Sequence, residues 1–79
     1  MRVLFFAQLK DATKCDSAEI ATSTPLDFEQ LWNLLVKKFP ALAKHRASVR
    51  LAKNSEYADA GATFSDADEV ALIPPVSGG

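Results

Sequence analysis

The sequence predicts an α+β fold in which one main helix packs on one face of a mixed β-sheet. Residues 2–9 and 69–73 are apolar runs of strand length, whereas residues 27–39 carry apolar side chains at helical spacing. The expected order is strand, strand, helix, strand, short strand, strand, which suits a helix packed on one sheet. The 79 residues are enough for one small domain and no more.

Residues 2–9 are expected to form the first strand, with large apolar side chains on both of its faces. A small domain can cover one sheet face with a helix but seldom both, so Leu4 and Phe6, or their neighbours, should be partly exposed. An exposed apolar patch commonly marks a partner surface, although a loop or second helix over it is the alternative. Residues 10–16 should be a polar turn, and residues 17–23 a short strand that pairs with the first as a hairpin.

The clearest predicted element is the helix over residues 27–39. Asp27 is a good N-cap, and Gln30 three residues later completes a capping-box pattern. Pro40 should end the helix, because the residue before a proline avoids the helical region. Five apolar residues share one helical face and are expected to pack against the sheet: Phe28, Leu31, Trp32, Leu35 and Phe39.

The second half of the chain is expected to complete the sheet. Residues 41–47 should form a short helical turn, residues 48–53 a third strand, and residues 56–58 a short return strand. A polar turn over residues 65–68 leads into the last strand, residues 69–73, which is apolar on both faces, as expected for a central strand. This order of elements is typical of a β-grasp (ubiquitin-like) roll.

Composition excludes several classes of function. The net charge is −1 without a basic stripe, so neither nucleic acid nor an anionic membrane is an expected partner. No apolar run reaches the roughly 20 residues of a membrane span, and the run over residues 3–7 is too short for a signal peptide. One cysteine excludes an internal disulfide, and a cytoplasmic protein is expected.

The sequence also contains no residues that would catalyse a reaction unaided. It has no Cys/His pair, phosphate loop or metal constellation, so we expect this chain to bind no cofactor and to be non-catalytic alone. Cys15 is a candidate persulfide carrier or nucleophile, but an incidental thiol is favoured because no partner residue is nearby. His45, between Lys44 and Arg46, is expected to be solvated.

The last six residues, with the sequence PPVSGG, are where we expect the function to reside. Prolines favour extended backbone and glycines lack a side chain, so residues 74–79 describe a slim tail beyond a domain over residues 1–73. Fully extended, six residues reach roughly 20 Å. Such a tail suits threading a narrow channel to present a terminal carboxylate, and an inert, frayed terminus is the alternative.

Beyond the order of its elements, the chain contains three segments that resemble a known protein family. Residues 3–8, 54–57 and 68–79 resemble the small, sulfur-carrying subunit of molybdopterin synthase (MoaD type), and the likeness extends over the whole chain. The PPVSGG ending is its most specific part. One departure is Ala67, where that family usually has glycine. If this position has a positive φ, alanine costs about 1 kcal/mol there.

The resemblance implies a chemistry for the end of the chain. The Gly79 carboxylate would be adenylated by an E1-like adenylyltransferase that uses ATP, and a sulfurtransferase would then provide sulfur to give a C-terminal thiocarboxylate. The large catalytic subunit would accept the tail within a heterotetramer. There the sulfur would pass to cyclic pyranopterin monophosphate and build the dithiolene of molybdopterin.

The resemblance also implies which residues contact the large subunit. Phe6, Tyr57 and Ile73 would form an apolar docking patch, although core packing is an alternative for Tyr57 and Ile73. The inserted tail would be Pro74, Pro75, Val76, Ser77, Gly78 and Gly79. Three other functions remain open: a sulfur carrier for thiamine thiazole synthesis, a ubiquitin-like modifier that forms isopeptide bonds, and an interaction module with an inert tail.

Overall fold

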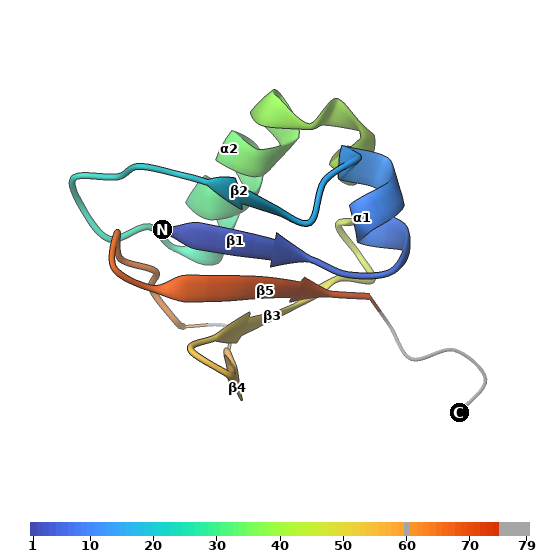
Figure 1. The fold of residues 1–79 in the computed structure, drawn as a ribbon. Helices are drawn as coiled ribbons and strands as arrows, with labels where there is room; N and C mark the ends of the chain where they lie inside the picture. Colours follow the sequence, from blue (N-terminus) through green and yellow to red (C-terminus); the bar gives the residue numbers. More distant parts are fainter. Residues whose placement is uncertain (60, 75–79) are drawn as a thin grey trace.

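The computed structural model describes residues 1–59 and 61–74, which form a five-stranded sheet with α2 over one of its faces (Figure 1). The strands are β1 (Arg2–Phe5), β2 (Ser17–Glu19), β3 (Arg50–Lys53), β4 (Glu56–Tyr57) and β5 (Glu69–Ile73). The helices are α1 (Gln8–Thr13), α2 (Phe28–Lys38) and a 3-10 helix, η1 (Pro40–His45).

The sheet has the strand order β2-β1-β5-β3-β4, so β5 lies in the middle. β5 runs parallel to β1, with Val3 opposite Val70, and antiparallel to β3, with Leu51 opposite Leu72. The other pairs are antiparallel. The first and last strands of the domain therefore lie side by side, as Figure 1 shows. This arrangement confirms the predicted mixed sheet, its central last strand and the β-grasp roll.

The hydrophobic core lies between the sheet and α2. Alternate side chains of the central strands, including Val3 and Leu72, are fully buried on this side. From α2 the core receives Leu31, Trp32 and Leu35, while Phe28 and Phe39 pack at its margin. The helical spacing in the sequence thus predicted the core-facing side of α2 correctly.

The start and the end of α2 follow from its sequence. The Asp27 carboxylate accepts a hydrogen bond from the Gln30 backbone N–H at 2.8 Å, and the Gln30 side-chain oxygen accepts one from the Asp27 N–H at 3.0 Å. This reciprocal capping box satisfies two backbone donors at the exposed N-terminus. The helix ends at Lys38, and the Phe39 N–H still bonds to the Leu35 carbonyl before Pro40 begins η1.

The segment after β1 differs from the prediction. β1 ends at Phe5, and residues 8–13 form helix α1, where the sequence predicted first a strand and then a polar turn. The physical reason is packing: Leu9 and Thr13, one helical turn apart, are both buried. Ala7 redirects the chain with φ 50° and ψ −127°. The predicted pairing of β1 with β2 is confirmed, but a helix connects them in place of a hairpin turn.

Other predicted elements are present with shorter bounds. β2 ends at residue 19, although Ile20 still exchanges two backbone hydrogen bonds with Met1. β3 begins at residue 50, because the N–H groups of Ser48 and Val49 bond to the His45 carbonyl. Asn54 and Ser55 both have positive φ and form the two-residue turn that joins β3 to β4. Ala67 does not have positive φ, so the cost considered for alanine at that position does not arise. None of the helices in residues 1–59 and 61–74 has the length and apolar character needed to cross a membrane.

Candidate functional site

The face of the sheet opposite α2 carries a row of apolar residues across four strands. Leu4 lies opposite Ala71, Ala71 opposite Ala52, and Ala52 opposite Tyr57. Because side chains alternate along a strand, all four point away from the core-facing side. We call this surface the open face. The two alanines at its centre, Ala52 and Ala71, have small side chains, so the large side chains of this face lie at its margins.

The structure brings Tyr57 and Ile73 to this open face. Ile73 is two residues beyond Ala71 on β5 and is half-buried, and Tyr57 on β4 is 67% exposed. The alternative that Tyr57 packs in the core is therefore wrong. Phe6 follows Phe5, whose partner is Leu72, so it lies beside the end of β5. Phe6 is 47% exposed, as the size of the domain predicted.

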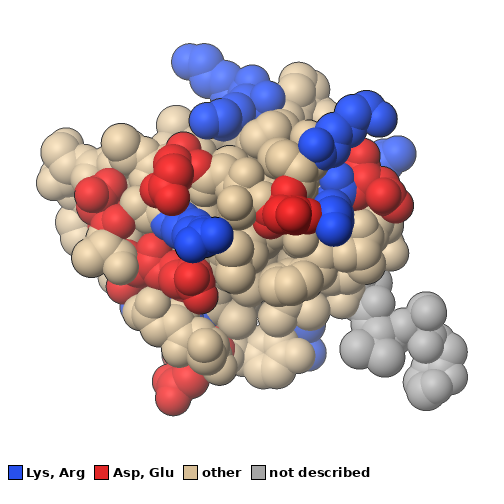
Figure 2. Space-filling model, in the orientation of Figure 1, with Lys and Arg blue, Asp and Glu red and all other residues tan. Residues whose placement is uncertain are grey.

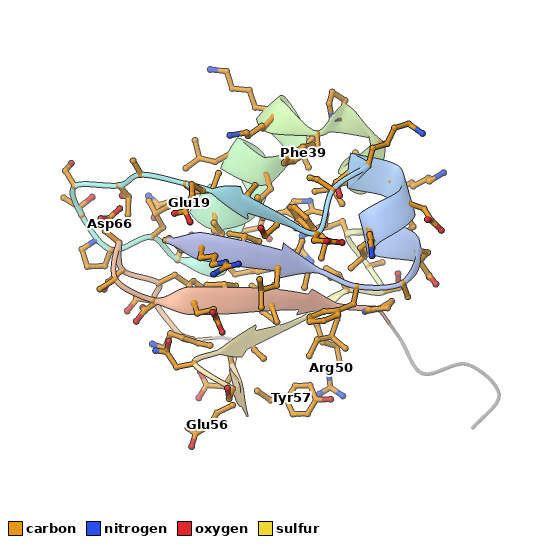
Figure 3. The ribbon with its side chains drawn as sticks, in the orientation of Figure 1. Glu19, Phe39, Arg50, Glu56, Tyr57 and Asp66 are labelled. Carbon is orange, nitrogen blue, oxygen red and sulfur yellow. The ribbon has the colours of Figure 1, made fainter. Side chains whose placement is uncertain are left out.

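A residue that the sequence analysis missed stands between two of these side chains. Arg50 is the partner of Ile73 across the ladder from β3 to β5, and its guanidinium carbon lies 5.2 Å from the centre of the Tyr57 ring. Figure 3 shows Arg50 and Tyr57 beside each other below the central strands. In the sequence Arg50 is simply a polar residue of an alternating strand, and only the register places it on the open face.

The tail begins at the same end of the open face. Pro74 is half-buried and directly follows Ile73. Pro75, Val76, Ser77, Gly78 and Gly79 lie outside the described residues. The boundary between a domain over residues 1–73 and a tail over residues 74–79 therefore stays a prediction, as do the roles of the tail residues.

Hydrogen bonds to two carboxylates fix the opposite end of β5. Asp68 accepts a hydrogen bond from the Ser65 N–H at 2.7 Å and another from the Asn54 amide at 3.0 Å, and these bonds lower the pKa of Asp68. Asp66 accepts one from the Thr22 N–H at 3.0 Å, which lowers its pKa as well. These contacts hold the turn before β5 and thereby set the register that builds the open face.

Charged side chains are unevenly distributed over the molecule. Figure 2, in the orientation of Figure 1, shows acidic groups toward the end where β5 begins and basic groups toward α1 and the helical side. The second half of β5, Ala71–Ile73, carries no charged residue, whereas β3 begins at Arg50 and ends at Lys53. On the open face, the apolar side chains of β5 therefore extend to Ile73, where they meet the charged Arg50 of β3.

Within residues 1–59 and 61–74 we find no arrangement suited to catalysis. No group of three His, Cys, Asp or Glu side chains gathers there. Cys15 is half-buried beside a polar pocket that Lys10 and Asp16 also line, and these two form an ion pair at 2.7 Å. This pair raises the pKa of Lys10. His45 is half-buried, whereas the sequence predicted a solvated side chain.

Comparison with known proteins gives a consistent result. The sequence profile of the ThiS family matches residues 3–79. A molybdopterin synthase sulfur carrier subunit from Arabidopsis thaliana is 35% identical over 79 residues, covering 100% of this chain and 82% of the relative. A protein of the same name from Mycobacterium tuberculosis is 34% identical over 82 residues, covering 100% of this chain and 96% of the relative.

Solved structures share the fold. The crystal structure of SAMP1 from Haloferax volcanii superposes with a TM-score of 0.84 at 26% identity, covering 100% of this chain and 98% of that one. A complex of subunits 1 and 2 of molybdopterin-converting factor from Helicobacter pylori contains a chain that superposes with a TM-score of 0.67 at 24% identity, covering 99% of this chain and 96% of that one. The chain under study therefore belongs to the ThiS family, and within it to the molybdopterin synthase sulfur carrier subunits.

Proposed function

We propose that this chain carries sulfur on its C-terminal glycine and donates it within molybdopterin synthase. The observation that supports this proposal is the position of the central strand β5. This strand contributes Ile73 to an apolar open face and continues directly into Pro74 and the PPVSGG tail. A partner that covers the open face would thus meet the base of the tail and receive its end in its own active site.

The proposed chemistry takes place at the main-chain carboxyl group of Gly79. A carboxylate is a poor electrophile, so an E1-like partner first converts it with ATP into an acyl-adenylate and releases pyrophosphate. Sulfur at the oxidation level of sulfide, provided by a sulfurtransferase, then attacks the acyl carbon and displaces AMP, which leaves a thiocarboxylate, a soft anionic nucleophile. This group attacks cyclic pyranopterin monophosphate through its sulfur and forms a thioester. Water then cleaves the acyl–sulfur bond, so the sulfur stays on the pterin as part of the dithiolene and Gly79 regains its carboxylate. The single cysteine permits no internal disulfide and suits a reducing compartment, so we place the reaction in the cytoplasm.

The partners supply the catalytic groups in this proposal. The described part of the chain offers no metal cluster, and Cys15 has no histidine partner. The large subunit therefore provides the bases and the cations that hold the pterin phosphate, in a heterotetramer. The carrier provides the docking patch formed by Phe6, Tyr57 and Ile73, and the tail from Pro74 to Gly79. ATP belongs to the activating partner, and the carrier itself binds no cofactor.

Mass spectrometry tests the loading step. After incubation with the activating enzyme, ATP and a sulfur source, the intact chain should gain about 16 Da, because sulfur replaces one carboxylate oxygen. A variant that lacks Gly79 is the matched control and should keep its mass and its fold. An unchanged mass of the wild-type chain, under conditions that load an established carrier, contradicts the proposal.

One observation favours a second function. SAMP1 from Haloferax volcanii, whose fold matches at 26% identity, belongs to the small archaeal modifier proteins by name. The same adenylated glycine is also an electrophile toward a lysine amine, which would give an isopeptide bond in place of a thiocarboxylate. Antibody detection of Gly79-dependent adducts of higher mass in the source cells would support this modifier function. Their absence, together with loading by sulfur, favours the carrier function alone.

A further inference from the structure

Arg50 is an unusual residue to find within an apolar docking surface. It is exposed on the open face, lies opposite Ile73 in the ladder and covers Tyr57 with its guanidinium group (Figure 3). Two of its neighbours are therefore members of the proposed docking patch. A partner that covers Tyr57 and Ile73 also covers the side chain between them.

Other cations near this residue have partners within the domain. Arg46 forms an ion pair with Glu29 and lies 4.3 Å from the centre of the Phe28 ring. The Lys53 ammonium donates a hydrogen bond to the Thr63 carbonyl at 2.8 Å. Arg50 differs from both: among the described residues, no acceptor lies within hydrogen-bond or ion-pair distance of its guanidinium. As far as residues 1–59 and 61–74 are concerned, its N–H donors are thus available to another molecule.

The Tyr57 ring lies beside these donors, with its centre 5.2 Å from the guanidinium carbon. An aromatic ring under a guanidinium covers one of its flat faces and leaves the in-plane N–H groups free at the edge. This planar fork matches the two oxygens of a carboxylate. When a partner covers the open face, an unpaired guanidinium loses its water without compensation, which is strongly unfavourable. The partner therefore needs an acceptor at this point, and a carboxylate is the best match in charge and shape.

We propose that Arg50 binds a carboxylate side chain of the large subunit within an otherwise apolar contact, beside Ile73, with Tyr57 as its positioning residue. This inference rests on the proposed function. The apolar patch accounts for attraction between the two subunits, whereas one buried ion pair accounts for choice among partners. Arg50 is then the specificity-determining residue of the docking surface.

Binding kinetics test this proposal with the full chain and the large subunit from the same organism. Arg50→Gln should weaken the complex by about tenfold or more, mainly through faster dissociation, because it leaves a carboxylate of the partner unpaired. Arg50→Lys should recover only part of this loss, because an ammonium lacks the planar fork.

Arg2→Gln is the matched control. Arg2 is also exposed on the open face and its loss changes the net charge equally, but it lies at the other end of the sheet, opposite Glu19 and Glu69. Its replacement should change affinity by less than about twofold. Equal effects of Arg50→Gln and Arg2→Gln, or no effect of either, overturn the proposal, since only overall charge would then matter.

A charge exchange identifies the partner residue. Arg50→Glu should abolish binding, and a single acid-to-lysine substitution in the large subunit should restore it. If no acidic residue of the contact surface restores binding, the paired carboxylate does not exist. Absence of binding by the wild-type chain refutes the proposed function itself and this inference with it. Normal binding that is insensitive to Arg50 refutes the inference alone.

Discussion

The two faces of the central strands are built from alternate residues of the same short segments, yet their side chains differ sharply in solvent exposure. On the side of α2, Val70 and Leu72 have no exposed surface. On the open face, Ala71 and Ile73 of the same strand are half-buried, and Tyr57 stands mostly in solvent. The covered face thus supplies stability and the open face remains available for a partner. Substitutions on the two faces should therefore have separable consequences.

The largest expected effect is on the covered face. Leu72→Ala removes a fully buried side chain and should lower the free energy of unfolding by about 2–5 kcal/mol, which is a large part of the stability of a small domain. Ile73→Ala, one residue later on the open face, is the matched control and should cost less than about 1 kcal/mol. Urea denaturation followed by circular dichroism measures both. Equal losses would mean that the open face is also part of the core.

The next effect concerns binding. Phe6→Asp places a charge in the proposed docking patch and should weaken binding to the large subunit by at least about 100-fold, because the contact must then bury an unpaired carboxylate. Its thermal midpoint should stay close to that of the wild-type chain, since Phe6 is 47% exposed already. Calorimetric titration and thermal unfolding measure the two quantities. A folded variant that binds normally would remove Phe6 from the docking patch.

A smaller effect is expected where the chain leaves β1. Ala7 adopts φ 50° and ψ −127°, a conformation that glycine reaches without steric cost. Ala7→Gly should therefore raise the free energy of unfolding by about 1 kcal/mol, after the entropy that glycine adds to the unfolded chain is subtracted. Ala12→Gly in helix α1 is the control and should be destabilising. Destabilisation by both variants would show that the backbone at Ala7 carries no strain.

The smallest effect depends on pH. The pKa values of Asp66 and Asp68 are lowered in the folded state, chiefly by the backbone N–H groups of Thr22 and Ser65. Their contribution to stability is therefore complete above the ordinary carboxyl pKa of about 4 and is lost as the pH falls through the lower folded values. Asp68→Asn should flatten the decline of the urea midpoint in this acidic range.

Glu56→Gln controls for the loss of one negative charge in that experiment. The Glu56 side chain has no hydrogen bond or ion pair within the described part of the chain, so its replacement should leave the slope unchanged. If Asp68→Asn and Glu56→Gln changed the slope of the urea midpoint against pH equally, net charge would be the origin of the acid sensitivity. The turn before β5 would then have no special part in it.

The sequence predicted the elements whose signals are long or flanked by strong end signals. The bounds of β5 agree with the prediction residue by residue, and α2 agrees within one residue at each end because Asp27 and Pro40 mark its limits. Helix α1 was missed because six residues are too few to show helical periodicity. The apolar run before it reads equally well as a continued strand.

The candidate site was predictable in part. The exposure of Phe6 was predictable because the first strand has two apolar faces, and a small domain can cover only one of them with a helix. Arg50 could not be found in this way, because its position relative to Tyr57 depends on the pairing of β3 with two other strands. Register is set by contacts distant in sequence, such as those of Asn54 with Asp68 and Glu69, which no local pattern contains.

The central position of β5 has a mechanical consequence. A pull applied beyond Pro74 acts along the axis of this strand, whose two ladders join it to β1 on one side and β3 on the other. Under such a load the hydrogen bonds of both ladders resist together, in shear, and cannot open one after another like a zip. A force applied along β5 from its C-terminal end would therefore load both ladders before it could unfold the domain.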